Sequence, residues 1–359
     1  MSWLLVFFTG ISVFWWLGVI ITFRIMPILD HVVGPDSNNP PDSALAWLER
    51  DPYYRKVNYL FIPVQYLSLV FACWLWAGGG WVTMDFVDKL GLMFTVGIVG
   101  GVAMNNAHIL GHGKRDGGRL LATLALAQTL YGHFNIEHNG GHHVRVATPE
   151  DPASSKMDES VYRFIPRSAF GGLVSAWSLE VSRMRGKGKK AHSIANDIVS
   201  GWLLSLFLFA GLAIWFRPVV LPWLFGQAII GIALLEAVNY LEHYGLRRRK
   251  TSAHRYEPVG PSHSWNSNTI VANVLLFHLQ RHSDHYAHPI RGYQALRTTE
   301  EAPQLPTGYA ALVPLAFVPP LWRRVMDKRV VAHYGGDVTR ASVLNPKKYL
   351  PKPPRTGGS

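Results

Sequence analysis

The strongest constraint on the fold is a set of five long runs of residues with almost no charged side chain. An α-helix rises about 1.5 Å per residue, so each run is long enough to cross a hydrocarbon core of roughly 30 Å. The runs cover residues 2–23, 57–79, 90–107, 198–216 and 218–241. Composition agrees, because 48% of the residues are hydrophobic and only 16% are charged, against about a quarter in soluble domains. The sequence therefore predicts an all-α integral membrane protein with five transmembrane helices.

The first apolar run, residues 2–23, raises the alternative of a secretory signal peptide. No Lys or Arg precedes this run and no small-residue cleavage motif follows it, so we expect an uncleaved first span. Two further apolar segments are not counted as spans. Residues 120–136 are expected to form a buried or in-plane helix, because a crossing there would separate the histidines described below. Residues 305–322 are interrupted by four prolines.

Basic residues gather beside these runs, and they predict how the chain is oriented. Cytoplasmic segments of membrane proteins carry an excess of Lys and Arg. The clusters are Lys114, Arg115 and Arg119; Arg183, Arg185, Lys187, Lys189 and Lys190; and Arg247, Arg248, Arg249 and Lys250. With five spans, this bias predicts an N-terminus outside the inner (cytoplasmic) membrane and a cytoplasmic cap made of residues 108–197 and 242–300. It also explains the excess of 35 Lys and Arg over 23 Asp and Glu, so no nucleic-acid partner is expected.

The domain boundaries follow from the point at which the regular spacing of apolar residues ends. Residues 1–327 are expected to form a single transmembrane domain. Residues 328–359 lose periodicity and end in Pro-Lys-Pro-Pro-Arg-Thr-Gly-Gly-Ser, which offers little to bury. This segment is predicted to be a partly mobile cytoplasmic tail.

Histidines are concentrated in the segments predicted to be cytoplasmic, and their spacing indicates a metal centre. His108 and His112 are four residues apart, which places both imidazoles on one helix face, about 40° apart. His138 and His142 repeat this spacing, and the adjacent His143 is expected to point to a different part of the site. Such an arrangement is expected where one segment serves two metal ions.

A third cluster follows the last span. His278, His282 and His285 are predicted to share one helical face, since offsets of four and seven fall within about 60° of arc. His243 stands alone where the fifth span ends. Three clusters at ligand spacing on one membrane face together indicate a site for more than one metal.

The residue types narrow the choice of metal without identifying it. Neutral imidazole suits iron, copper, zinc and nickel, and Cys73 is the single cysteine, which excludes iron–sulfur and multi-thiolate zinc sites. A zinc-protease helix reads His-Glu-x-x-His, but Ile109 stands where that motif needs its Glu. Glu137, Glu242 and Asp284 lie beside the histidines and are candidates to accept hydrogen bonds from imidazole N–H groups.

Several longer motifs resemble those of the membrane alkane monooxygenases, which are related to xylene monooxygenases and, more distantly, to membrane fatty-acid desaturases. These motifs are Asn38-Asn39-Pro40-Pro41, Tyr131-Gly-His-Phe134, residues 146–155, residues 239–246, residues 263–268, residues 279–285 and residues 305–309. The resemblance implies a non-haem di-iron monooxygenase that hydroxylates the terminal carbon of medium-to-long-chain n-alkanes to primary alcohols. It also implies O₂ as oxidant, electrons from rubredoxin with rubredoxin reductase upstream, and substrate arriving from the lipid bilayer.

Three alternatives remain open on the sequence. The first is a related alkyl-aromatic hydroxylase, the second is a fatty-acyl desaturase, and the third is a metal-deficient or catalytically weakened copy of the same fold. The first two share the ligand set and differ in the shape of the substrate channel. The third arises from departures within the motifs.

The family holds two irons with nine histidines, and the resemblance implies eight of these ligands here. They are His108, His112, His138, His142, His143, His243, His282 and His285. Tyr286 occupies the ninth position and puts the second iron site in doubt, because a phenol with a pKa near 10 is a poor ligand for ferrous iron. His278 is a candidate substitute. Ile109, Gly113 and Gly140 replace a Glu, a Lys and a long basic residue of the family. The family usually has six spans, and the first of these has no counterpart among the five runs.

Overall fold

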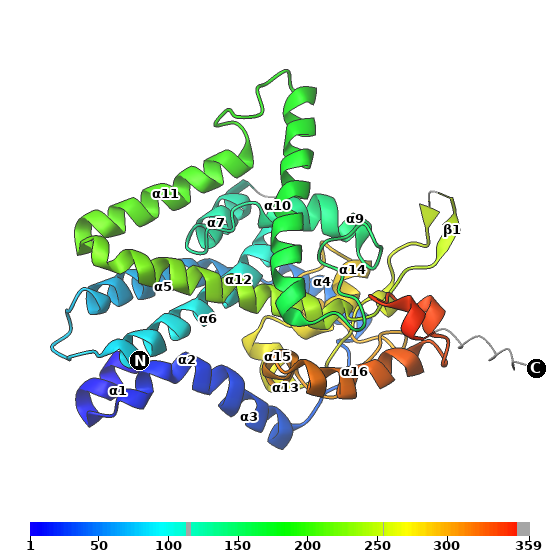
Figure 1. The fold of residues 1–359 in the computed structure, drawn as a ribbon, viewed down its shortest axis with the longest axis horizontal. Helices are drawn as coiled ribbons and strands as arrows, with labels where there is room; N and C mark the ends of the chain where they lie inside the picture. The colour runs from blue at the N-terminus through cyan, green and yellow to red at the C-terminus, as the bar shows by residue number, and fades with distance from the viewer. Residues whose placement is uncertain (113–115, 254, 350–359) are drawn as a thin grey trace, which may run out of the picture.

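The computed structural model describes residues 1–112, 116–253 and 255–349, and this part of the chain is almost entirely helical (Figure 1). Five helices are long and apolar enough to cross a membrane: Ser12–Val33, Pro52–Trp76, Phe86–Gly111, Asp197–Phe216 and Pro218–His243. A short antiparallel hairpin of β1 (Lys250–Ser252) and β2 (Arg255–Tyr256) is the exception to an all-α fold. The prediction of a helical membrane protein with five spans is confirmed.

The first span lies about ten residues later than predicted. Helix α1 (Ser2–Thr9) ends at Gly10, whose φ of +69° is left-handed, a conformation that glycine adopts without strain. A new helical segment then continues from Ser12 to Val33. Its parts are η1 (Ser12–Trp16), α2 (Leu17–Ile20), η2 (Ile21–Ile25) and α3 (Met26–Val33). The predicted span over residues 2–23 is therefore wrong, because Gly10 interrupts it and the apolar helix extends further.

The next two spans overlap the predicted runs 57–79 and 90–107, with ends three to five residues away, and they begin at capping residues. The Asp51 carboxylate accepts a hydrogen bond at the start of α5 (Pro52–Trp76). At the start of α6 (Phe86–Gly111), Asp85 and Asp88 cap each other's backbone N–H groups. Such caps satisfy amides that have no partner within the helix. They fix where each apolar helix begins.

The last two spans are joined by a tight turn. Asn196 caps α11 (Asp197–Phe216), with its side-chain oxygen 2.9 Å from the Ile198 amide. The short η4 (Pro218–Val220) then leads into α12 (Leu221–His243). Both spans lie within one residue or two of the predicted boundaries.

Helices α6 and α12 pack along each other and reach the same end of the molecule (Figure 1). A Cβ atom on Gly101 of α6 would lie 2.7 Å from the Leu234 side chain of α12, so the absence of a side chain allows the close approach. His108 and His243 lie near the C-terminal ends of these helices. At about 1.5 Å per residue, each is roughly 33 Å from the start of its helix, which is the depth of a hydrocarbon core.

Two apolar segments that were not expected to be spans are indeed short or broken. Helix α7 (Asp116–Ala127) has 12 residues, too few to cross a bilayer. Residues 305–322 contain the whole of the short helix α15 (Tyr309–Ala316) and the start of α16 (Pro319–His333). The short elements that complete this part of the chain are α4 (Asp42–Arg50), α8 (Phe134–Glu137), η3 (His138–His142), α9 (His143–Arg145), η5 (Pro261–His263), α13 (Ile270–Leu275), η6 (Leu279–Arg281), α14 (His282–Ala287), η7 (Tyr293–Ala295), η8 (Val338–Arg340) and η9 (Pro346–Lys348).

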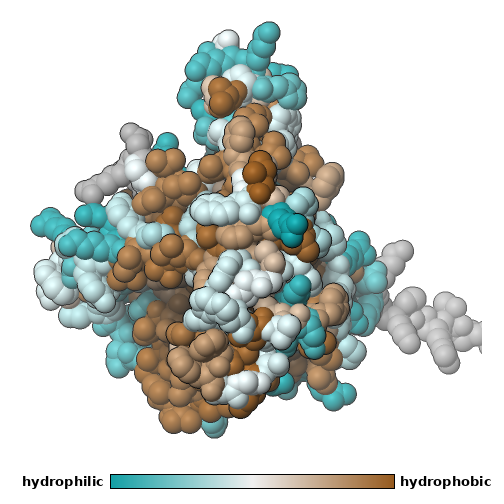
Figure 2. Space-filling model, turned by 90° about the vertical axis from the view of Figure 1, so that its left-hand side faces the viewer, coloured by the Kyte–Doolittle hydropathy of each residue, from teal (hydrophilic) through white to brown (hydrophobic). Residues whose placement is uncertain are grey.

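A long helix outside the spans, α10 (Val161–Gly186), runs across the other helices in Figure 1. Figure 2 views the molecule from the end where α11 and α5 turn, and hydrophobic residues cover much of this face. Hydrophilic residues gather at the top, where α10 leads into the loop before α11. Hydrophilic residues also lie at the sides of this view, and the broad hydrophobic surface between them is expected of a protein embedded in lipid.

The predicted mobile tail is corrected over most of its length. Helix α16 continues to His333, and Val330, Tyr334 and Ala341 are buried in the same core as α12. The backbone of Ser342 pairs with Met157, and Lys348 reaches the Asp158 carboxylate. Apolar side chains spaced irregularly along the tail therefore pack into a core, and the local sequence periodicity does not predict this packing. Residues 350–359 lie outside the described residues.

Candidate metal centre

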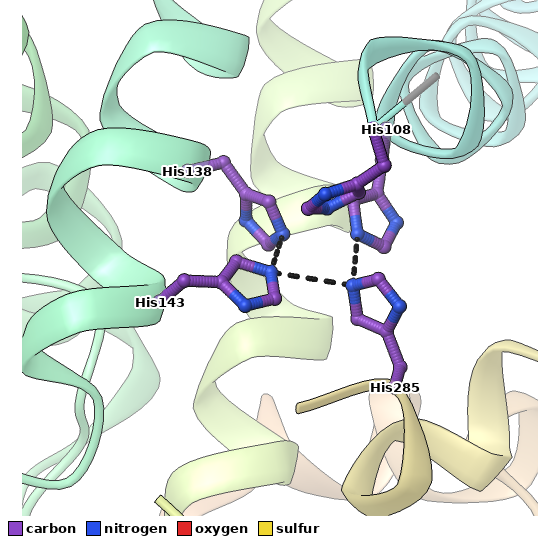
Figure 3. Close-up of side chains that lie close together, drawn as sticks. His108, His138, His143 and His285 are labelled. Atoms are coloured by element: carbon purple, nitrogen blue, oxygen red, sulfur yellow. Dashed lines mark hydrogen bonds between the residues drawn. The ribbon is translucent and has the colours of Figure 1, made fainter. Parts of the chain in front are cut away.

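Five histidines form a compact group at the ends of three segments, and we call it the five-histidine group. One ring nitrogen from each lies within 4.8 Å of the others. The members are His108, His112, His138, His143 and His285. Four of them are labelled in Figure 3, where rings from α6, from the α8–α9 segment and from α14 point toward one another. Segments more than a hundred residues apart thus supply one cluster.

The ring nitrogens of this group are spaced as ligands of one cation. Nε2 of His285 lies 2.9 Å from Nε2 of His108 and 3.2 Å from Nε2 of His143. Nε2 of His143 also lies 2.9 Å from Nε2 of His138. An imidazole nitrogen has one in-plane direction for a proton or a lone pair, so it cannot hydrogen-bond two such partners well. Two imidazole nitrogens bound at right angles to a metal, at about 2.1 Å each as in zinc sites, would be about 3.0 Å apart.

A π-helical turn decides which histidines pair. In η3 the backbone bonds connect residues five apart, and the His143 amide donates to the His138 carbonyl. The His138 and His143 rings are therefore neighbours, with centroids 4.6 Å apart, and His142 is turned elsewhere. The four-residue spacing predicted the pair His138 and His142, with His143 apart from them. That assignment is wrong, because it presumes an α-helical period.

His142, His243 and Tyr286 form a second group, which we call the tyrosine group. The Tyr286 hydroxyl lies against Nε2 of His142 and 3.0 Å from Nε2 of His243. Nδ1–H of His142 donates to the Asp151 carboxylate at 2.9 Å, and Nδ1–H of His243 donates to the His263 carbonyl at 3.3 Å. These partners place the ring proton on Nδ1. Each Nε2 therefore presents a lone pair to the tyrosine oxygen.

One hydroxyl proton cannot satisfy both lone pairs. The Tyr286 O–H can be donated to His142 or to His243, and the other nitrogen then faces oxygen lone pairs in a buried space. Burial raises the pKa of the Tyr286 hydroxyl well above its ordinary value, so the phenol keeps its proton unless a cation replaces it. Two imidazole nitrogens and a phenol oxygen that converge in this way form a donor set suited to a metal ion.

His282 lies between the two groups. Its ring centroid is 5.2 Å from that of His285 and 4.7 Å from that of Tyr286. Its Nε2 faces the Glu242 carboxylate at 3.6 Å, too far for a hydrogen bond. The structure thus brings together all eight histidines that the sequence singled out as ligands, together with Tyr286.

Burial keeps these imidazoles neutral, which is the form that binds a metal. Burial lowers the pKa of His112 to about 4. Burial and repulsion from neighbouring histidines lower the pKa of His143 to about 2. The same two causes lower the pKa values of His138, His282 and His285.

The carboxylates near the histidines differ from the sequence prediction. Asp284 accepts hydrogen bonds from Arg291 at 2.6 Å and holds none of the clustered imidazoles. Glu137 accepts from Arg145 at 2.8 Å. Of the three predicted acceptors, only Glu242 faces a clustered ring, at a distance beyond hydrogen bonding.

Asp151 is the acceptor that the sequence reasoning missed. It is buried, accepts from His142 Nδ1 at 2.9 Å and from the Ser154 hydroxyl at 2.6 Å. Burial works to raise the pKa of Asp151, but His142 and the hydrogen bonds outweigh it and hold the pKa below its usual value. The only signal in the sequence was its place within residues 146–155, one of the motifs that carry the family resemblance.

His278 lies outside both groups. Phe277 and His278 have left-handed backbones, with φ of +55° and +54°, and the helix that carries His282 and His285 begins only at His282. The prediction of one helical face through all three histidines is therefore wrong. Of the other departures from the family motifs, Ile109 lies beside His108 and His112 in the wall of a small cavity, Gly140 is exposed in η3, and Gly113 lies outside the described residues.

An apolar cavity borders the histidines on the side of the spans, and we call it the apolar cavity. Its walls come from the first span, α6, α12 and α15, and include Phe23, Val102, Leu234, Val238, Leu276 and Val313. At one end it reaches His108, His138 and His282. The Asn105 amide in its wall donates to the Leu276 carbonyl at 2.8 Å, so this polar side chain is not left unpaired toward the cavity. Hydrophobic side chains of the spans therefore line a cavity that ends at the metal-binding rings.

Comparison with known families agrees with this combination of spans and histidines. The family model described as fatty acid desaturase matches residues 89–316, a stretch that contains both histidine groups. The fold and the site thus define a membrane protein of the desaturase class with a histidine-rich metal centre.

Individual relatives narrow the class. An alkane 1-monooxygenase of Acinetobacter baylyi is 46% identical over 92% of this chain and 80% of its own length. An alkane 1-monooxygenase of Ectopseudomonas oleovorans is 43% identical over 93% of this chain and 83% of its own. The hydroxylase component of xylene/toluene monooxygenase from Pseudomonas putida is 26% identical over 87% of this chain and 81% of its own. The chain belongs to the alkane 1-monooxygenase family, and it is an oxidoreductase of the monooxygenase type.

Proposed function

We propose that this protein hydroxylates the terminal carbon of medium-to-long-chain n-alkanes to primary alcohols, with O₂ as oxidant. The observation that carries the proposal is the position of the five-histidine group at the end of the apolar cavity. Alkanes dissolve in the bilayer, and the cavity lies between helices that span it. The names of the relatives support the same substrate class.

The lining of the cavity supports attack at the end of the alkane chain. A linear alkane whose terminal methyl group reaches this end of the cavity would meet His108, His138 and His282. The walls offer hydrophobic side chains and no charged group except Glu242 near that end. Such walls hold the substrate by burial of apolar surface and keep water away from the reacting carbon.

We infer that the centre holds two iron ions. The five-histidine group would bind one iron, and the tyrosine group with His282 would bind the other. Bound iron would supply the reduction of O₂ and the insertion of one oxygen atom into the C–H bond. The protein's own residues orient the ligands: Asp151 and the His263 carbonyl fix the tautomers of His142 and His243.

Electrons would come from rubredoxin at a basic cleft near the tyrosine group. The cleft has a volume of about 710 Å³ and is lined by Arg247, Arg249, Lys250 and Arg340, among others. Its wall includes His263, whose carbonyl accepts the hydrogen bond from the His243 ring. Positive charge at the mouth would steer an acidic one-electron carrier, and the wall would bring it within one hydrogen bond of a metal ligand.

The same basic residues support the proposed orientation. Placement of Arg247 to Lys250 on the cytoplasmic side of an inner membrane puts the cleft and both histidine groups there, with the N-terminus outside. Soluble electron carriers then have direct access to the centre.

Product analysis tests the proposal. The iron-loaded protein in lipid vesicles, supplied with rubredoxin, rubredoxin reductase, NADH and O₂, should convert a linear alkane to its primary alcohol. A xylene and a fatty-acyl substrate serve as matched competitors. Alkenes from the acyl substrate, or benzylic alcohols in preference to alkanols, would replace the proposal with a desaturase or an alkyl-aromatic hydroxylase.

A paired charge reversal tests the electron entry point. Arg249→Glu with Arg340→Glu should slow rubredoxin-driven turnover at low salt and weaken its salt dependence. Turnover driven by a small chemical reductant should not change. Equal loss with both donors would contradict docking at the cleft.

A further inference from the structure

A second cavity, here called the polar cavity, lies next to the apolar cavity and also borders the histidines. It is lined by Tyr131, His133, Glu137, Ser168, Glu236 and Asn239, and it also touches His138 and His142. These two rings belong to the five-histidine group and to the tyrosine group respectively. Phe134, His138 and Asn239 border both this cavity and the apolar cavity. The centre therefore has an apolar approach and a polar approach separated by a thin wall.

Glu236 stands at the inner end of the polar cavity. It is 3% exposed and belongs to the spanning helix α12, seven residues before His243. Its carboxyl group accepts a hydrogen bond from the Tyr131 hydroxyl at 2.7 Å and one from the Asn239 amide at 3.3 Å. None of the ion pairs found between described residues involves Glu236. An acidic group at such a depth is expensive to bury and marks a functional position.

The polar cavity suits a water molecule. Its volume of about 20 Å³ exceeds the roughly 10–15 Å³ that one water needs. Both ring nitrogens of His133 and one Glu137 oxygen are buried in this region without a protein partner. The other Glu137 oxygen is bound to Arg145, whose side chain reaches the surface. A water molecule in this cavity therefore has hydrogen-bonding partners between Glu137 and Glu236.

The proposed reaction needs a supply of protons. One oxygen atom of O₂ enters the C–H bond and the other leaves as water, which consumes two electrons and two protons for each alcohol formed. The electrons come from the carrier protein, and the walls of the apolar cavity are mostly hydrophobic, with Glu242 and Tyr309 as its titratable groups besides the histidines. The polar cavity joins titratable groups, Glu137 and Glu236, to a ring of each histidine group.

We propose that Glu236, with Tyr131, is the proton relay that serves the metal centre through water in the polar cavity. In each transfer, the Glu236 carboxyl group gives its proton to the cavity water, which passes a proton to the oxygen being reduced. The carboxylate regains a proton from solvent water entering beside Glu137 and Arg145. The groups that face Glu236 are Tyr131, Asn239 and Ser168, and His142 across the cavity. This inference rests on the proposed monooxygenase function.

The first test uses the metal-free protein and needs no turnover. Infrared spectroscopy should show the C=O stretch of a neutral carboxyl group that shifts in D₂O and is absent in Glu236→Gln. This substitution keeps the size of the side chain and an oxygen for the Tyr131 hydroxyl. No difference between wild type and Glu236→Gln would overturn the proposal, whether or not the protein makes alcohol.

The second test uses the iron-loaded protein. Glu236→Gln should retain the iron content of the wild type, slow alcohol formation about 100-fold, release H₂O₂ instead, and lose the solvent deuterium isotope effect of proton delivery. Glu236→Asp should recover part of the rate, and Tyr131→Phe should have a smaller effect of the same kind. Loss of iron from Glu236→Gln, or unchanged coupling of O₂ use to alcohol formation, would overturn the proposal. If the wild type itself makes no alcohol, the proposed function fails while the infrared result still decides the state of Glu236.

Discussion

The two halves of the histidine cluster share the η3–α9 segment and α14, but they differ in their third segment, α6 or α12, and in their donor atoms. The five-histidine group presents imidazole nitrogens alone, within 4.8 Å of one another. The tyrosine group presents two imidazole nitrogens whose lone pairs meet at the Tyr286 oxygen, with His282 turned toward Glu242. A single substitution therefore leaves one half rich in ligands for ferrous iron and gives the other a harder oxygen ligand.

This difference shows that the position of a ligand side chain and the type of its donor atom can vary independently. Helix α14 places the buried Tyr286 hydroxyl against Nε2 of His142 and of His243, at the position where the family resemblance implies a ninth histidine. The tyrosine changes the oxidation state of iron that the tyrosine group prefers, since phenolate favours ferric over ferrous iron. We therefore expect the two halves to bind iron with unequal affinity.

The largest effect should follow loss of a ring from the five-histidine group. His143→Ala should abolish turnover and remove one iron per chain, because His143 contacts both His138 and His285. The loss should exceed the roughly 10–100-fold that follows loss of a ligand's hydrogen-bond partner. Iron analysis and alcohol formation measure it, and His192→Ala, outside both groups, is the control. Wild-type iron and turnover in His143→Ala would contradict this part of the comparison.

Replacement of the oxygen ligand should make the two halves alike. Tyr286→His should tighten the second ferrous iron about tenfold or more and raise turnover, whereas Tyr286→Phe should loosen it. Competition with a ferrous chelator gives the affinities. The ferric wild type should also show a visible phenolate-to-iron absorption that both variants lack. If that absorption persists in Tyr286→Phe, the oxygen of Tyr286 is not a ligand.

A smaller effect is expected where one half alone loses a supporting hydrogen bond. Asp151→Asn should weaken one of the two iron equivalents about 10–100-fold, because Asp151 accepts from His142 and no ring of the five-histidine group. Stepwise chelation distinguishes the two equivalents. Equal weakening of both would show that the halves are not independent.

The smallest effect belongs to His278, which lies near the cluster but outside it. His278→Gln should leave the iron content unchanged. Burial lowers the pKa of His278 to about 4, below its unfolded value near 6.5. Stability from the neutral ring is thus present above pH 6.5 and is lost as pH falls toward 4, because the unfolded chain binds the additional proton. Thermal unfolding of the metal-free variant should depend less steeply on pH in this range, and a fall in iron content would show that His278 is a ligand.

Much of the fold could be predicted from the sequence because a bilayer imposes simple rules. Runs without charge give spans of a fixed length, and four of the five lie where the runs lie. The first differs because Gly10 adopts a left-handed backbone that hydropathy does not register. The tail differs because Val330 and Tyr334 pack against helices far away in sequence, and no local pattern announces such contacts.

The sequence predicted which histidines meet in the site, but it did not predict how they are grouped there. Histidines at ligand spacing identified the rings that meet, but the π-turn of η3 exchanged the places of His142 and His143. A left-handed backbone at His278 removed a ring that helical geometry had placed on the shared face. Asp151 could not be found by spacing, because its contact with His142 depends on the loop after η3. Periodicity assumes one helix type, and sites like this one depart from it.

The number of iron ions per chain is the most direct test of the two-group centre. Protein purified in detergent with ferrous iron, then freed of loosely bound metal by gel filtration, should hold close to two irons, with the less tightly held one lost first to a chelator. One iron per chain, unchanged at higher iron supply, would contradict the claim that the tyrosine group binds a metal.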